Sequence, residues 1–139
     1  MRNRLKFRWY SKVYNKVCEV NSIYLNNEFV NFHLDDFNDI TTKICDENGY
    51  LIQCTGQEDK NSQLIYEGDI IYKKGNKDHK NEKLNSVVIY DSMYCCFELA
   101  DENGCHRMPA NSQNLEVLGN IYENLRLQTC YKSIKEFES

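Results

Sequence analysis

The sequence contains a single proline and no apolar run long enough to cross a membrane. A membrane-spanning helix needs about 18 or more consecutive apolar residues, and no stretch of this chain approaches that length. Residues 1–4 are basic, but no apolar segment follows them, so they do not have the pattern of a secretory signal. We therefore expect a cytoplasmic protein.

The sequence also lacks a surplus of positive charge. It has 17 Lys and Arg residues against 21 Asp and Glu residues, a net charge of −4. Domains that bind DNA or RNA usually carry a strong basic balance, and the acidic excess is too small for a mimic of nucleic acid. The charge is uneven, because residues 1–17 contain basic side chains and no acid.

Catalytic motifs are missing as well. The sequence has no P-loop, G-x-G-x-x-G, H-E-x-x-H or G-x-S-x-G pattern. Cys105 and His106 are neighbours on an expected strand, so they point to opposite faces and do not form a nucleophile–base pair. Asp35 and Asp36 fit an acidic loop tip. We expect no enzyme, no catalytic residue and no cofactor.

The cysteines favour packing over chemistry. There are seven of them at irregular spacing, and without an export signal we expect reduced thiols. Cys95, Cys96, Cys105 and His106 are the candidate metal ligands. With Asn-Gly as a two-residue turn, however, Cys96 lies about 20 Å from Cys105 along the hairpin. A zinc site gathers its ligands within about 2.3 Å of one point, so we expect no metal.

Aromatic and β-branched residues indicate a mainly β protein. Ten tyrosines and six phenylalanines suit pleated, half-buried surfaces. Residues 5–10 alternate apolar with cationic or polar side chains, which predicts a strand with an apolar face and a cationic face. The strands expected in chain order are residues 5–10, 17–25, 29–34, 41–45, 50–54, 68–74, 84–90, 94–100, 105–108 and 115–119.

Three glycine turns punctuate these strands. Asn48-Gly49 lies between two apolar runs and predicts a tight hairpin between residues 41–45 and 50–54. Asn103-Gly104 predicts a second hairpin.

The third turn organises the chain, because residues 64–72 join an apolar run to a strand through Glu-Gly-Asp. Gly68 permits a backbone conformation that side chains disfavour, and Asp69 is expected to accept hydrogen bonds from nearby amides. We interpret this segment as a structural corner.

Two kinds of binding surface are candidates. Arginine beside tyrosine and tryptophan is typical of interaction hot spots, which favours a partner-binding surface at Arg8, Trp9, Tyr10 and Tyr14. The strands at residues 5–10 and 94–100 are expected to be open edges, and their pairing with a second copy would give a homo-oligomer.

The alternative is nucleic acid bound by a cationic face and a cationic loop. Its candidate residues are Lys6, Arg8, Lys73, Lys74, Lys77 and Lys80.

The motifs resemble those of a known family. Residues 51–56, the Asp59-Lys60-Asn61 turn, residues 65–70 and residues 116–124 closely resemble, in that order, the signature of the YopX family. The resemblance implies a small phage or prophage protein without an established activity, whose C-terminal half is similar to an SH3-type barrel. The family usually has Asn-Gly where this chain has Asn61-Ser62, which weakens the expected turn there.

We therefore expect three parts: a β-rich subdomain at residues 1–60, an SH3-like barrel at 61–125 and a helical tail at 126–139. Cys130, Ile134 and Phe137 would lie on one face of that helix. The expected function is a non-enzymatic phage accessory protein, in the cytoplasm of an infected or lysogenic bacterium. It would bind a host or phage macromolecule, with inhibition of a host defence system as the sharpest version. The alternatives are a nucleic-acid-binding module and a structural homo-oligomer of phage development.

Overall fold

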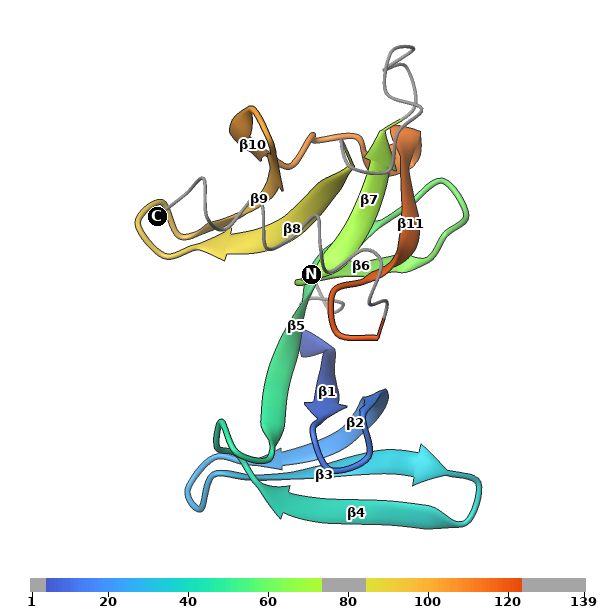
Figure 1. Ribbon diagram of the computed structural model, residues 1–139, viewed down its shortest axis with the longest axis vertical. Coiled ribbons are helices and arrows are strands. Elements are labelled where there is room, and N and C mark those ends of the chain that lie inside the picture. Colours follow the sequence, from blue (N-terminus) through green and yellow to red (C-terminus); the bar gives the residue numbers. More distant parts are fainter. Residues whose placement is uncertain (1–4, 74–84, 124–139) are drawn as a thin grey trace.

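The computed structural model describes residues 5–73 and 85–123. These residues form two antiparallel sheets of six and five strands and no α-helix, which confirms the mainly β fold within the described ranges. The two sheets lie toward opposite ends of the long axis (Figure 1). None of the described segments is a helix long and apolar enough to span a membrane.

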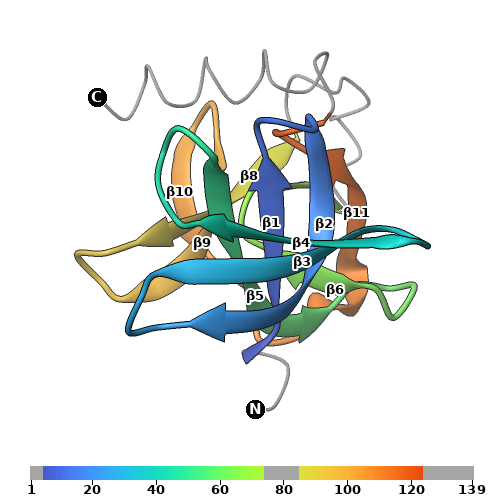
Figure 2. The same cartoon turned by 90° about the horizontal axis from the view of Figure 1, so that it is seen from below.

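The first sheet has the strand order β4–β3–β2–β1–β5–β6. Its strands are β1 (Phe7–Ser11), β2 (Lys16–Tyr24), β3 (Phe29–Asp35), β4 (Asn38–Lys43), β5 (Gly49–Glu58) and β6 (Leu64–Tyr66). Trp9, Cys18, Val30 and Phe32 form its buried core. Figure 2 views the molecule from this end, with β1 to β4 in front.

The second sheet has the order β10–β9–β8–β7–β11. Its strands are β7 (Asp69–Lys73), β8 (Ser86–Asp91), β9 (Cys96–Asp101), β10 (Gly104–Arg107) and β11 (Leu115–Asn120), with a short 3-10 helix, η3 (Ser112–Asn114), before β11. Ile71, Val88, Leu99 and Leu115 pack on one face around Ile65, which comes from β6. The last strand of the first sheet therefore helps to form the core of the second.

Strand β5 belongs to both halves of the molecule. Its first part pairs with β1 and its last part with β6, and Figure 1 shows it running from one sheet to the other. Ile52 and Cys54 of β5 form a buried cluster with Tyr66 of β6. The division proposed between residues 60 and 61 falls in the turn between β5 and β6, and stays a prediction.

The corner between β6 and β7 has the structure that the sequence predicted. Gly68 has φ +85°, and a Cβ there would lie 2.6 Å from the ring of Tyr122. The Tyr66 N–H donates a hydrogen bond of 2.8 Å to Asp69 Oδ2. The tight turn and the close approach of Tyr122 both require glycine at this position.

The hairpin predicted at Asn48-Gly49 is wrong. Strand β4 pairs with β3, whereas β5 pairs with β1 on the other side of the sheet. The Asn48 side chain donates to the carbonyl of Lys43, and the N–H groups of Asn48 and Gly49 both reach the Cys45 carbonyl. These bonds close a local turn between β4 and β5, but the two strands pair with β3 and β1 instead of with each other.

The hairpin predicted at Asn103-Gly104 is present with a different register. Gly104 pairs with Asp101, so the loop residues are Glu102 and Asn103. Cys105 therefore faces Ala100 rather than Glu102, and Cys96 lies four residues along β9 from that point, about 13 Å away at the usual rise. Among the described residues, no three His, Cys, Asp or Glu side chains are close enough to hold a metal ion.

The expected open edges are also wrong. Strand β1 lies between β2 and β5, and β9 lies between β8 and β10, so both are interior. The edges in the described ranges are β4, β6, β10 and β11, and no ladder joins β10 to β11 there. Closure into an SH3-type barrel stays a prediction, and the predicted helix at residues 126–139 lies outside the described residues.

Candidate partner-binding site

Trp9 does not belong to a surface site. Its side chain is fully buried and stacks on Phe32 with ring centroids 6.4 Å apart. The assignment of Trp9 to a binding surface is wrong because its position on β1 places it on the apolar face of the strand, as the alternation of residues 5–10 indicates.

Arg8 lies on the opposite face of β1, where it is already engaged. Its Nε lies 2.9 Å from Glu19 Oε1, and its Cζ sits 3.9 Å from the centroid of the Tyr66 ring. The ion pair uses one of the five guanidinium donors, and the cation–π contact covers one face of the group. We therefore assign Arg8 to the junction between the sheets.

Tyr10 is part of an aromatic stack at the same junction. Its ring centroid lies 5.3 Å from that of Tyr122 and 6.2 Å from that of Tyr50, and its hydroxyl donates to Asn15 Oδ1 at 2.6 Å. Tyr14, in the turn before β2, is 45% exposed. The four residues predicted for one binding surface therefore have separate roles.

The residues predicted for nucleic acid are not gathered on one face. Lys6 is exposed just before β1, and Lys73 is exposed at the end of β7 in the other sheet. Lys74, Lys77 and Lys80 lie outside the described residues. Because Arg8 is paired with Glu19, the described ranges contain no continuous cationic surface built from this set.

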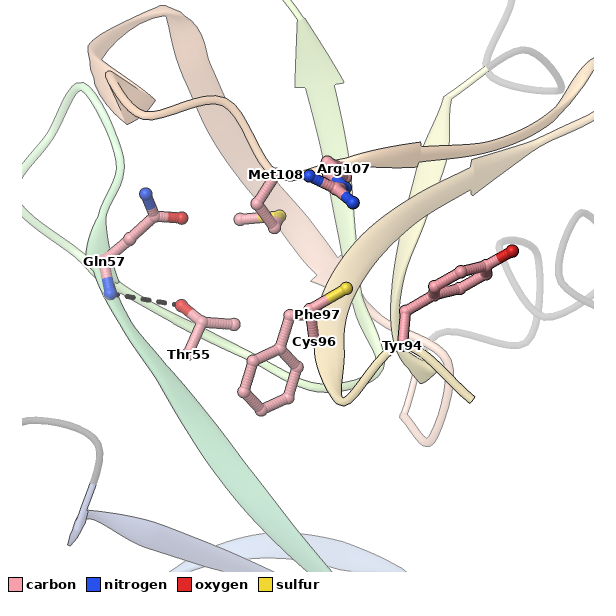
Figure 3. A pocket seen from close by; sticks show the side chains of 7 residues that line it. All are labelled: Thr55, Gln57, Tyr94, Cys96, Phe97, Arg107 and Met108. Carbon is pink, nitrogen blue, oxygen red and sulfur yellow. Dashed lines mark hydrogen bonds between the residues drawn. The ribbon is translucent and has the colours of Figure 1, made fainter. Parts of the chain in front are cut away.

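A groove of about 410 Å³ opens where β5 meets the β9–β10 hairpin. This volume is in the range of ligand-binding clefts. Figure 3 shows its lining, with the β5 residues facing Met108 and the β9 strand. The groove is lined by Thr55, Gln57, Tyr94, Cys96, Phe97, Arg107 and Met108.

The walls of the groove are fixed by packing and hydrogen bonds. Phe97 and Met108 pack against the core of the second sheet. Thr55 Oγ1 donates to the Ile65 carbonyl and accepts from the Gln57 N–H, the second of which is drawn in Figure 3. Gln57 Nε2 donates to the Pro109 carbonyl at 2.9 Å, so the β5 wall is tied to the segment that follows β10.

The turn between β8 and β9 presents two large exposed side chains, of which Tyr94 lines the groove. Met93 is 81% exposed and Tyr94 is 64% exposed. Asp91 Oδ1 accepts from the N–H groups of both residues. A hydrogen bond from Glu98 and these backbone bonds lower the pKa of Asp91, so its carboxylate is charged and holds the turn at neutral pH.

Arg107 is the cation of the groove. It is exposed, and among the described residues it makes no ion pair. Figure 3 shows its side chain next to Met108 at one side of the groove. The groove therefore combines an apolar floor with a single unpaired positive charge.

No motif in the sequence marks this groove. Its walls come from Thr55 and Gln57 of β5, from the β8–β9 turn and from the end of β10. The two β5 residues are separated in the chain from the other two segments by about 40 or more residues. The available signal was the pair of large apolar residues Met93-Tyr94 in a turn, where polar residues are the rule. No local pattern in the sequence indicates which strand lies opposite these two residues.

The residues that carry the family resemblance hold the turns together. Asp59 is fully buried; its Oδ1 accepts from the N–H groups of Asn61 and Gln63, and its Oδ2 from that of Val117. The turn expected to be weak at Asn61-Ser62 is thus fixed to β11. These contacts assign a structural role to Asp59.

Comparison with known proteins gives a family and a fold. A family model described as "YopX protein" matches residues 6–128. The crystal structure of protein EF1440 from Enterococcus faecalis is similar with a TM-score of 0.57 and 19% identity, covering 88% of this chain and 96% of that one. At that identity the likeness shows the fold alone. No curated protein matches the chain.

Proposed function

The chain belongs to the YopX family, and from this premise we propose that it is a non-enzymatic accessory protein of a phage or prophage that acts by binding another protein. The family resemblance supports the phage context, and the form of the surface supports binding. The place of action is the cytoplasm of the infected or lysogenic bacterium.

The observation that carries the proposal is the groove beside the β8–β9 turn. Met93 and Tyr94 are exposed in a turn whose backbone is held by Asp91. Exposed tyrosine and methionine next to a preformed cleft are features of protein-binding surfaces, where tyrosine often carries much of the affinity. Because the turn is already ordered, binding needs little further loss of conformational freedom.

The sharpest form of the proposal is inhibition of a host defence system. A small phage protein that contains an ordered binding surface and no recognised catalytic motif is suited to blocking a host protein by occupying it. The nucleic-acid alternative is weakened because Arg8 is engaged with Glu19. Assembly with copies of itself would use the edges β4 or β10.

The test is capture of a host protein by the tagged full chain, followed by reconstitution with that protein purified. We expect Tyr94→Ala to weaken the purified complex about 30-fold, the effect of losing a hot-spot side chain of about 2 kcal/mol. Phe37→Ala is the matched control, because Phe37 is a 94% exposed aromatic in a turn of the other sheet.

Three results would overturn the proposal. One is a partner whose affinity for Tyr94→Ala equals its affinity for the wild-type chain. Another is binding of duplex or single-stranded DNA or RNA that survives moderate salt. The third is a mass in solution that shows a stable homo-oligomer and no captured host protein.

A further inference from the structure

We propose that the groove binds an extended segment of the partner protein that carries a single acidic residue, with its carboxylate on Arg107 and an adjoining apolar side chain on Phe97 and Met108. This inference rests on the proposed function and names the chemistry of its partner. It follows from the charge, the shape and the surroundings of the groove.

The charge comes from Arg107. Glu98 is its cross-strand neighbour, but Glu98 is buried whereas Arg107 is exposed, and no ion pair joins the two. Arg107 makes no ion pair with the described residues. A planar guanidinium offers two parallel N–H donors that match the two oxygens of a carboxylate.

The floor of the groove supplies the apolar contact. Phe97 and Met108 are partly buried and pack on the core of the second sheet, so they form a surface already in place. A volume of about 410 Å³ accommodates a few side chains and not a folded domain. Methionine adapts to side chains of different shape, which suits a groove that reads a short segment.

The polar groups of the β5 wall also fit a peptide. The Gln57 amide nitrogen is already bonded to the Pro109 carbonyl, which leaves its oxygen as an acceptor for a backbone N–H. The Tyr94 hydroxyl, in a ring that is 64% exposed, is able to donate to a backbone carbonyl. An extended segment presents both kinds of group along its length.

The surroundings favour a carboxylate on a peptide over a nucleic acid. A single-stranded nucleic acid needs a track of several cations for its phosphates, and among the described residues the groove lining contains one cation, Arg107. Acidic residues lie near both ends of β9, with Asp91 at the end of β8 and Asp101 and Glu102 at the other end. Their charges disfavour a chain of phosphates and also a run of acidic residues, so the segment is expected to place a single carboxylate on Arg107.

The test is selection of random ten-residue peptides displayed on phage against the immobilised full chain. The peptides recovered are then synthesised, and their affinities are measured by fluorescence anisotropy. We expect Asp or Glu to be enriched next to an apolar residue. Arg107→Glu is expected to weaken these peptides at least tenfold, whereas Lys43→Glu, the same charge reversal on the exposed end of β4, changes their affinity less than twofold.

Each other outcome overturns the inference. Recovered peptides without an acidic preference, peptides that bind Arg107→Glu unchanged, or no recovered peptide would exclude the acidic segment. Competition by oligo-dT would assign the groove to nucleic acid instead. If Arg107→Glu lowers the melting temperature, its loss of binding is not interpreted, and Arg107→Gln is used instead. That variant must keep the wild-type melting temperature and still lose affinity. The effect of Tyr94→Ala on the purified complex tests the proposed function, and the peptide experiments test only the chemistry of the bound segment. Failure of one is therefore distinguishable from failure of the other.

Discussion

Two buried aspartates show how hydrogen bonds decide the charge of a carboxyl group. Burial raises the pKa of Asp59, but three backbone N–H donors outweigh it, so the pKa lies below its usual value. Burial likewise raises the pKa of Asp69, which has one backbone donor, from Tyr66, and its pKa reaches about 7. Asp59 has three backbone donors and Asp69 has one, and burial has the larger effect on the pKa of Asp69.

Asp69 makes the stability of the fold depend on pH near neutrality. Its pKa in the folded chain lies above that of the unfolded chain, so the folded state binds the additional proton. Its contribution to stability is full below about pH 4 and is lost as the pH rises through 7. The shift corresponds to up to about 4 kcal/mol. We expect the urea midpoint to be higher at pH 5 than at pH 8.

Asp69→Asn is the control for this pH dependence. The amide oxygen still accepts the Tyr66 N–H, but the side chain no longer titrates. We expect the difference in urea midpoint between pH 5 and pH 8 to shrink in this variant. An unchanged difference would assign the titration to another group, with Glu67, whose pKa is also raised by burial, as the next candidate.

At the scale of the elements, glycines mark the places where one segment passes close to another. A Cβ at Gly49 would lie 1.9 Å from the Tyr10 carbonyl oxygen, and one at Gly68 would lie 2.6 Å from the Tyr122 ring. A Cβ at Gly104 would have no heavy atom within 4 Å. At Gly49 the added Cβ would meet backbone atoms, which cannot move aside. At Gly68 it would meet a ring that can shift in part, and at Gly104 it would meet no atom.

This order predicts the stability of three variants. Gly104→Ala is expected to cost about 1 kcal/mol of unfolding free energy, from backbone strain alone. Gly68→Ala is expected to cost roughly 2 kcal/mol more, because the Tyr122 ring must shift, and Gly49→Ala is expected to be the most destabilising. Urea denaturation of the three proteins measures the order. Equal losses in all three would show that steric contact is not the reason for glycine.

The elements also show which local signals were sufficient. The Glu-Gly-Asp corner was predicted correctly because its turn depends on the positive φ of Gly68 and on the bond from the nearby Tyr66 N–H to Asp69. The contact of Gly68 with Tyr122 is distant in the chain and was not predicted. Asn48-Gly49 was assigned to a hairpin because Asn and Gly occur both in hairpin turns and in turns whose flanking strands pair elsewhere. Which strand β5 pairs with is decided by β1, about forty residues earlier in the chain, and no local signal reports it.

At the scale of the whole molecule, the two sheets are joined by shared structure. Ile52, Cys54 and Tyr66 of the first sheet form a buried cluster. Tyr122, which follows β11 of the second sheet, packs against this cluster and stacks on Tyr10 of β1. Glu123 Oε2 accepts from the Val17 N–H of β2, a further link between the halves. We therefore expect the two sheets to unfold together.

Trp9 provides a probe for this cooperativity. It is the only tryptophan and lies in the core of the first sheet, so its fluorescence reports on that sheet. We expect its urea transition to coincide with the transition seen by far-UV circular dichroism, which reports on both sheets. Tyr122→Ala is expected to lower both midpoints. Two separate midpoints in the wild-type chain would show that the sheets are independent units.

The sequence by itself determined all the strands except β6, most of their limits, the apolar face of β1 and the corner at Gly68. These depend on alternation and on turn residues, which act between neighbours in the chain. Only the tertiary structure decided that β5 pairs with β1 rather than with β4, that β5 joins the two sheets, and that Thr55, Phe97 and Arg107 line one groove. Those features depend on which strands lie side by side, and pairing between distant strands is set by the packing of the whole chain.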